Sequence, residues 1–274
     1  MEKKIRAGGL ALCLLAGAAF MADRLFWCEP YTGFVRVGPA ALRWGGWLVL
    51  GALCLLLGRR AAPCPAALQQ PCRPLGGCLT AAAAALLAAG AAALPHRTAG
   101  TAVMPQASAR VVGVLNVLLP LLAAACLALL SRRAFAGPMQ GTIPSAAPAL
   151  GLLLWVFWVL LYRFEIQPAA VARLSCTVRV ISACAAVVFA LALCKTLLAP
   201  GTPCGGQLAG SGLAAFLFCF CMELPGSFIE QGAGGLSAAE QCTSLGLGVL
   251  GLCGAVCFWQ AFGPDGRHAP EQTH

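Results

Sequence analysis

Two groups of charged residues interrupt the apolar runs in the second half of the chain. The first group is mainly basic and the second is acidic: Arg163, Glu165, Arg173 and Arg179, then Glu223, Glu230 and Glu240. Ionisable residues close to lipid are rare, and they tend to pair with one another or to face a polar cavity. We therefore predict a ligand-binding site with Glu165, Arg173, Arg179 and Glu223 among its residues.

Arg179 belongs to a polar stripe, because Ser175, Arg179 and Ser182 follow one another at helical spacing. We predict that Arg179 pairs with Glu223 near the outer membrane boundary and lines a cavity that admits a polar or anionic ligand. The alternative is that each side chain extends to the lipid headgroups as an ordinary anchor.

Asn116 is the fifth candidate for ligand binding, and it lies one turn before Pro120 in an apolar run. A proline removes one backbone hydrogen bond and usually kinks a membrane helix. The Asn116 amide could bind a ligand, or it could join two helices through a hydrogen bond worth about 1 kcal/mol.

Sixteen cysteines raise the question of a metal or redox site. No Cys-x-x-Cys pair occurs, and Cys219 and Cys221, two apart on a helix, point to different faces. Cysteines inside apolar runs act as small apolar fillers. Cys28 and Cys242 fall on the same predicted side of the membrane, where an oxidising compartment would allow a disulfide. We predict no metal and no cofactor.

Enzyme chemistry lacks its usual residues in this chain. The histidines are His96, His268 and His274. A metalloprotease needs a histidine pair with a glutamate on one helix, and a serine hydrolase needs a base beside its nucleophile. The sequence therefore favours a protein that is not an enzyme.

The elements that carry these residues are apolar runs. Of the 274 residues, 60% are hydrophobic and 10% are charged, whereas soluble domains carry about 25% charged residues. We predict an all-α integral membrane protein, a bundle of about eight transmembrane helices that forms one domain over residues 1–274. The predicted spans are 7–22, 44–58, 75–94, 111–130, 148–164, 175–198, 207–223 and 244–262, with a short polar tail at 263–274.

Three spans carry more detailed expectations. The first follows Lys3 and Lys4, a pattern that also fits a cleaved signal peptide and would then leave seven spans. Pro168 is suited to a helix's first turn, which predicts that the sixth helix begins there and measures roughly 46 Å, longer than the bilayer core. The seventh span is expected to end near Pro225.

Basic pairs at residues 3–4, 59–60 and 132–133 predict the orientation. The positive-inside rule places these pairs and both termini in the cytoplasm, and the two charged groups outside. Abundant Ala, Gly and Leu, with Arg in excess of Lys, indicate a GC-rich genome and a bacterial cytoplasmic membrane.

The predicted partners are the lipid bilayer and other membrane proteins. Small residues on the third and eighth helices, such as Ser244, Gly248, Gly251 and Ala255, would allow close helix packing. No basic stretch is interleaved with aromatic residues, so nucleic acid is not expected.

We expect an accessory or sensor-like membrane protein with a small-ligand cavity at its outer face. The alternatives are a small-molecule or ion transporter and a membrane-embedded enzyme of unfamiliar type. A polar cavity reaching Asn116 would favour transport, whereas a dry centre packed with alanine and glycine would favour the accessory role.

Overall fold

The computed structural model describes residues 2–29, 33–61, 70–96, 106–137, 139, 143–166, 173–199 and 204–262. Over these residues the chain is helical, apart from turns and two isolated backbone bridges. The helices are α1 (Glu2–Trp27), α2 (Ala40–Gly58), α4 (Arg73–Ala93), η1 (Leu94–His96), α5 (Gln106–Ala136), α6 (Ile143–Leu161), η2 (Tyr162–Ile166), α7 (Leu174–Leu198), α8 (Gly205–Ala215), η3 (Phe216–Glu223), α9 (Leu224–Gly232) and α10 (Ala238–Gln260).

Eight helical segments in the described part of the chain are long and apolar enough to cross a membrane. Each overlaps one of the predicted spans, and the chain is an all-α multi-pass membrane bundle, as predicted. The predicted tail, 263–274, lies outside the described residues.

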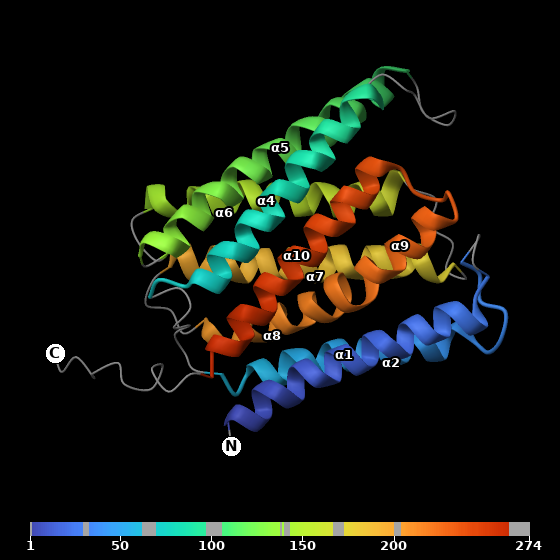
Figure 1. Cartoon of the computed structure of the whole chain (residues 1–274), viewed down its shortest axis with the longest axis horizontal. Helices are drawn as coiled ribbons and strands as arrows, with labels where there is room; N and C mark the ends of the chain where they lie inside the picture. The colour runs from blue at the N-terminus through green and yellow to red at the C-terminus, as the bar shows by residue number, and fades with distance from the viewer. Residues whose placement is uncertain are drawn as a thin grey trace.

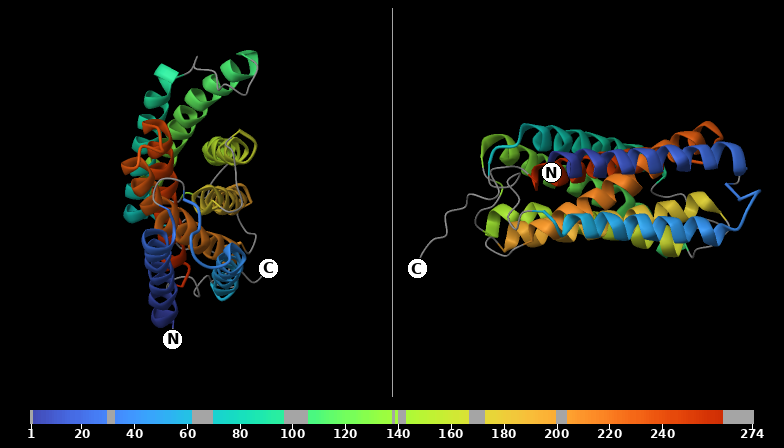
Figure 2. Two further views of the ribbon diagram at one scale, coloured as in Figure 1. Left: turned by 90° about the vertical axis from the view of Figure 1, so that its right-hand side faces the viewer. Right: turned by 90° about the horizontal axis from the view of Figure 1, so that it is seen from below.

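Six of the spans form a closed ring. Around it α4 packs on α5, α5 on α6, α6 on α7, α7 on α8, α8 on α10, and α10 on α4 (Figure 1). The ring encloses the larger of two apolar cores, built mainly from alanine and leucine side chains. The second core lies between the seventh span and the helices α1 and α2, which stand in different layers of the molecule (Figure 2).

The seventh span is one helix from Gly205 to Gly232, and it crosses between these layers. Near its start a side chain on Gly210 would meet the α2 backbone at 3.0 Å, and further along Cys221 approaches Gly17 of α1. The prediction that this span ends near Pro225 is wrong. The helix runs on to Gly232, and Pro225 lies where the π-helical segment η3 returns to α-helix in α9.

The sixth span begins at Leu174, one residue before the predicted span 175–198, but the helix begins later than the predicted start at Pro168. Arg173 has an extended backbone (φ −94°, ψ 100°) and bridges Phe34 in the connection between α1 and α2. The Leu174 N–H donates to the Gly33 carbonyl at 3.0 Å. These backbone contacts hold Arg173 out of the helix, so a helix that runs on from Pro168 is wrong; Pro168 itself lies outside the described residues.

Glycines on α10 allow close helix crossings. A side chain on Gly251 would meet the Ala215 carbonyl at 2.8 Å, and one on Gly248 would meet Leu224 at 2.9 Å. On α4, Gly90 packs against Leu121. These small faces therefore pack within the chain, and association of the same helices with other membrane proteins stays a prediction.

Candidate functional site

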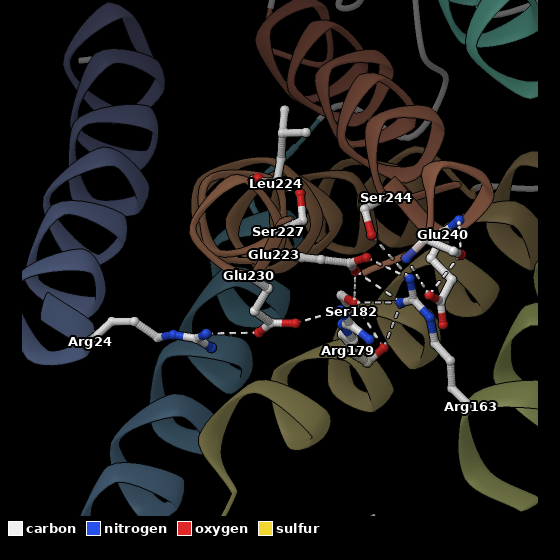
Figure 3. A network of polar contacts seen from close by, with 11 residues as sticks. Arg24, Arg163, Arg179, Ser182, Glu223, Leu224, Ser227, Glu230, Glu240 and Ser244 are labelled. Carbon is white, nitrogen blue, oxygen red and sulfur yellow. Dashed lines mark hydrogen bonds and ion pairs between the residues drawn. The ribbon is translucent and has the colours of Figure 1, made fainter. Parts of the chain in front are cut away.

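A cluster of charged and hydroxyl side chains is buried at the end of the bundle where α1 ends and where α7 and α10 begin (Figure 3). Its members come from five spans and are joined by hydrogen bonds and ion pairs. We call it the charged cluster: Arg24, Arg163, Arg179, Ser182, Glu223, Glu230 and Ser244.

The most deeply buried ion pair joins Arg163 of η2 to Glu223 of η3. Nη2 of Arg163 lies 2.5 Å from Oε1 of Glu223, and Nη1 lies 3.0 Å from Oε2. The side chains are 6% and 1% exposed. A two-pronged contact of this kind is the strongest that arginine makes with a carboxylate.

Other polar groups surround this pair. Nη1 of Arg163 also donates to the Arg179 carbonyl at 2.8 Å and to the Ser182 hydroxyl at 3.3 Å, while Nη2 donates to Ser244 at 3.4 Å. Ser182 in turn donates to Glu223. Such bonds offset the desolvation that otherwise makes a buried ion pair unfavourable.

Glu230 forms the second centre of the charged cluster. Its Oε1 accepts from Arg24 at 2.7 Å, and its Oε2 accepts from Arg179, so one carboxylate holds two guanidinium groups (Figure 3). Within the cluster three arginines therefore face two glutamates, and Figure 3 draws the carboxylate of Glu240 in the same polar network.

Both members of the most buried pair lie on π-helical segments. Arg163 belongs to η2, which extends α6, and Glu223 ends η3, which extends α8. A π turn rotates the following side chains relative to an α-helix, and π turns often occur at functional sites. Here the two segments bring the pair together between the helices.

Gln241 is a buried polar residue whose side-chain amide has no hydrogen-bond partner in the described part of the chain. It lies one turn before Ser244 on α10, so both side chains fall on the same face. The side chain is 8% exposed, and among the described residues neither its amide oxygen nor its amide nitrogen has a hydrogen-bond partner. Buried polar groups are nearly always satisfied, so this position is suited to a bound molecule that both donates and accepts.

The predicted pairing of Arg179 with Glu223 is wrong. Arg179 pairs with Glu230 of α9, because Arg163, turned inward by η2, occupies Glu223. Glu165 is exposed beside the cluster, and Arg173 is half-buried at the start of α7, where its backbone bridges Phe34. Of the four charged candidates, the structure brings Arg179 and Glu223 into the cluster and leaves the other two outside it.

Asn116 takes the second of its two predicted roles. Its Oδ1 accepts a hydrogen bond from Nε1 of Trp158 at 2.8 Å, which joins α5 to α6. The cysteines at 28 and 242 are both free, so the disulfide considered for them is absent. Within the described ranges, no group of three or more His, Cys, Asp or Glu side chains is arranged to hold a metal ion.

Arg24, Arg163 and Glu230 were not predicted as site residues. Each lies where an apolar run meets a charged connection, which is also where ordinary membrane anchors lie. The available signal was the balance of charge, since basic and acidic residues gather at the same predicted end of the spans.

The cluster can bind a polar or anionic group through arginine, hydroxyl and amide donors. No family model, no curated protein and no solved structure matches this chain.

Proposed function

We propose that the protein is an accessory or sensor-like component of a bacterial cytoplasmic membrane that binds a small anionic ligand at the charged cluster. The observation that carries the proposal is the Gln241 side-chain amide, which has no partner among the residues that the structure describes and lies one turn from the Ser244 hydroxyl that contacts Arg163. With both termini in the cytoplasm, this end of the bundle faces outward.

The arginines of the cluster favour an anion. Glu230 is shared between Arg24 and Arg179, so an incoming carboxylate or phosphate would give one of these guanidinium groups an acceptor of its own. Because α1 carries Arg24 and α7 carries Arg179, ligand occupancy would change the packing of these helices against α9. This coupling is what a sensor requires.

The centre of the helix ring supports an accessory role over transport. Its buried side chains are apolar and rich in alanine, including Ala82, Ala123, Ala186 and Ala190. The Asn116 amide oxygen, the midplane group that a transport path would use, accepts from Trp158. Neither observation supports a polar path.

Ligand binding can be tested on the full chain in lipid nanodiscs. We expect a panel of small carboxylates, phosphates and zwitterions to contain compounds that raise the unfolding temperature. A ligand whose concentration is 100 times its Kd stabilises the folded protein by about 2.7 kcal/mol. Gln241→Met removes an unsatisfied amide while keeping the volume, so the variant should fold but bind at least tenfold more weakly.

The matched control is Gln231→Met, because Gln231 is an exposed glutamine at the same end of the bundle. This variant should respond to ligand as the wild type does. If no compound stabilises the wild type, or if Gln241→Met retains the full response, the ligand proposal is wrong.

Orientation needs a separate experiment. In a background without native cysteines, single cysteines at Gln140, Gln167 and Gln231 can be treated with an impermeant maleimide in intact cells. Labelling at 167 and 231 but not at 140 supports the outward placement of the charged cluster, and the reverse pattern refutes it.

A further inference from the structure

The seventh span presents two glutamates to the charged cluster from one face. Glu223 and Glu230 are seven residues apart, about two turns of α-helix, and both point toward the arginines (Figure 3). Glu223 pairs with Arg163 of η2, and Glu230 pairs with Arg24 of α1 and Arg179 of α7. The rotation of this span about its own axis therefore decides whether three arginines have a counter-charge.

The wide turns of η3 set that rotation. The Leu224 N–H donates to the Cys219 carbonyl, five residues back, and the Phe216 and Phe220 rings stack with their centroids 5.3 Å apart. A π segment accommodates extra chain, so the residues after it are turned back by about 100° per extra residue relative to a continuous α-helix. Phe220 is the one residue of η3 that is not buried, and we take it as the extra residue.

An α-helix over the same residues would turn both glutamates away from the cluster. After a shift of one residue, Met222 would take the place of Glu223, and Ile229 would take the place of Glu230. The arginines would then face apolar side chains. Because the π-helix is rare and the α-helix is the ordinary form, the ion pairs of these two glutamates oppose the ordinary form.

The neighbours of η3 leave room for a rotation. A side chain on Gly251 of α10 would meet the Ala215 carbonyl at 2.8 Å, and one on Gly17 of α1 would meet the Cys221 carbonyl at 2.7 Å. At both points the neighbouring helix presents a glycine, so no side chain there blocks the rotation. Beyond α9, the exposed connection 232–235 is rich in glycine and can take up one residue.

We propose that the seventh span has two registers, π and α, and that the charged cluster holds it in the π register. When the glutamates lose their arginines, η3 becomes α-helical, and α9 turns by about 100° and advances by about 1.5 Å. Pro225 at the start of α9 is compatible with this change, since α5 runs through Pro120. An anion bound at the arginines would release the span; this consequence rests on the proposed function, whereas the change of register does not.

The test moves each glutamate back by one residue. The shifted variant combines four substitutions: Met222→Glu, Glu223→Met, Ile229→Glu and Glu230→Ile. In this variant the α register alone brings both glutamates to the arginines, so we expect the protein to fold with its seventh span in that register.

A spin label at Gln231, an exposed residue of α9, reports the rotation. Reference labels stand at Val111 of α5 and Leu245 of α10, both exposed, in a background without native cysteines. At a side-chain radius of about 5–6 Å, a turn of about 100° moves the label by about 8 Å. Pulsed electron paramagnetic resonance in nanodiscs should therefore record a change of at least about 4 Å in one of the two distances.

Deletion of Phe220 is the matched control. It makes the span α-helical by removing the extra residue and leaves Glu223 and Glu230 opposite their arginines, so the label should keep its wild-type distances. A shifted variant that keeps the wild-type distances, or that does not fold, overturns the proposal. A Phe220 deletion that displaces the label overturns it as well. No ligand is present in these measurements, so their failure and the failure of the ligand proposal are distinguishable.

Discussion

Removing the charge of Arg163 or of Glu223 alone should destabilise the protein more than removing both charges together. In Arg163→Gln the Glu223 carboxylate, 1% exposed, would keep only the Ser182 hydroxyl among the side chains that contact it in the cluster. In Glu223→Gln the guanidinium would stay buried without a counter-charge. Stranding one member of a buried ion pair costs about 3–5 kcal/mol.

The double variant leaves neither member of this pair charged, so we expect it to lose less stability than either single variant. The coupling energy between the two sites is then at least about 3 kcal/mol. Additive losses would instead sum to about 6–10 kcal/mol, which approaches the whole stability of a typical domain.

The free energy of unfolding can be measured for all four proteins in mixed micelles by titration with denaturing detergent, followed by circular dichroism. If a single variant fails to fold, recovery of folding in the double variant tests the same coupling. Additive losses would refute the inference that the pair is enclosed. Arg36→Gln breaks an exposed pair, 62% and 39% accessible, and as a control should cost less than about 1 kcal/mol.

Three further outcomes are expected. Gly212→Ala should lower the free energy of unfolding by about 1–3 kcal/mol, because the new methyl group would meet an α10 carbonyl at 2.6 Å. Gly77→Ala is the control: the space around Gly77 is open, so this variant should unfold with the same free energy as the wild type. Asn116→Leu should cost about 1 kcal/mol in the same assay through loss of the bond to α6. Burial, with the carboxylate of Asp23, raises the pKa of the Cys28 thiol. Cys28 should therefore be alkylated more slowly at pH 8 in the folded protein than in the unfolded chain. Because the unfolded thiol ionises first, the free energy of unfolding should fall as pH rises above the ordinary thiol range.

The membrane class and the spans followed from the sequence because lipid imposes a simple rule. A helix that crosses the bilayer must be apolar for about 20 residues, and this pattern is local. The small face of α10 was also predictable, since Gly248 and Gly251 recur at helical spacing, and both make close contacts.

The contacts of the charged cluster were less predictable because they depend on backbone register. Nothing in the residues around Arg163 signals a π turn, yet η2 decides that Arg163, and not Arg179, binds Glu223. Spacing within one helix cannot show such a contact.

The bond between Arg24 and Glu230 also bears on the order of biosynthesis. The partners are 206 residues apart, so at about 5–20 residues per second α1 would wait roughly 10–40 s for its counter-charge. Arg6 waits longer still, since it donates to the carbonyl of Phe262. Helix α1 therefore completes its docking after the helices that follow it, and a nascent chain that stalls before α9 would present an unpaired arginine to the quality-control proteases of the membrane.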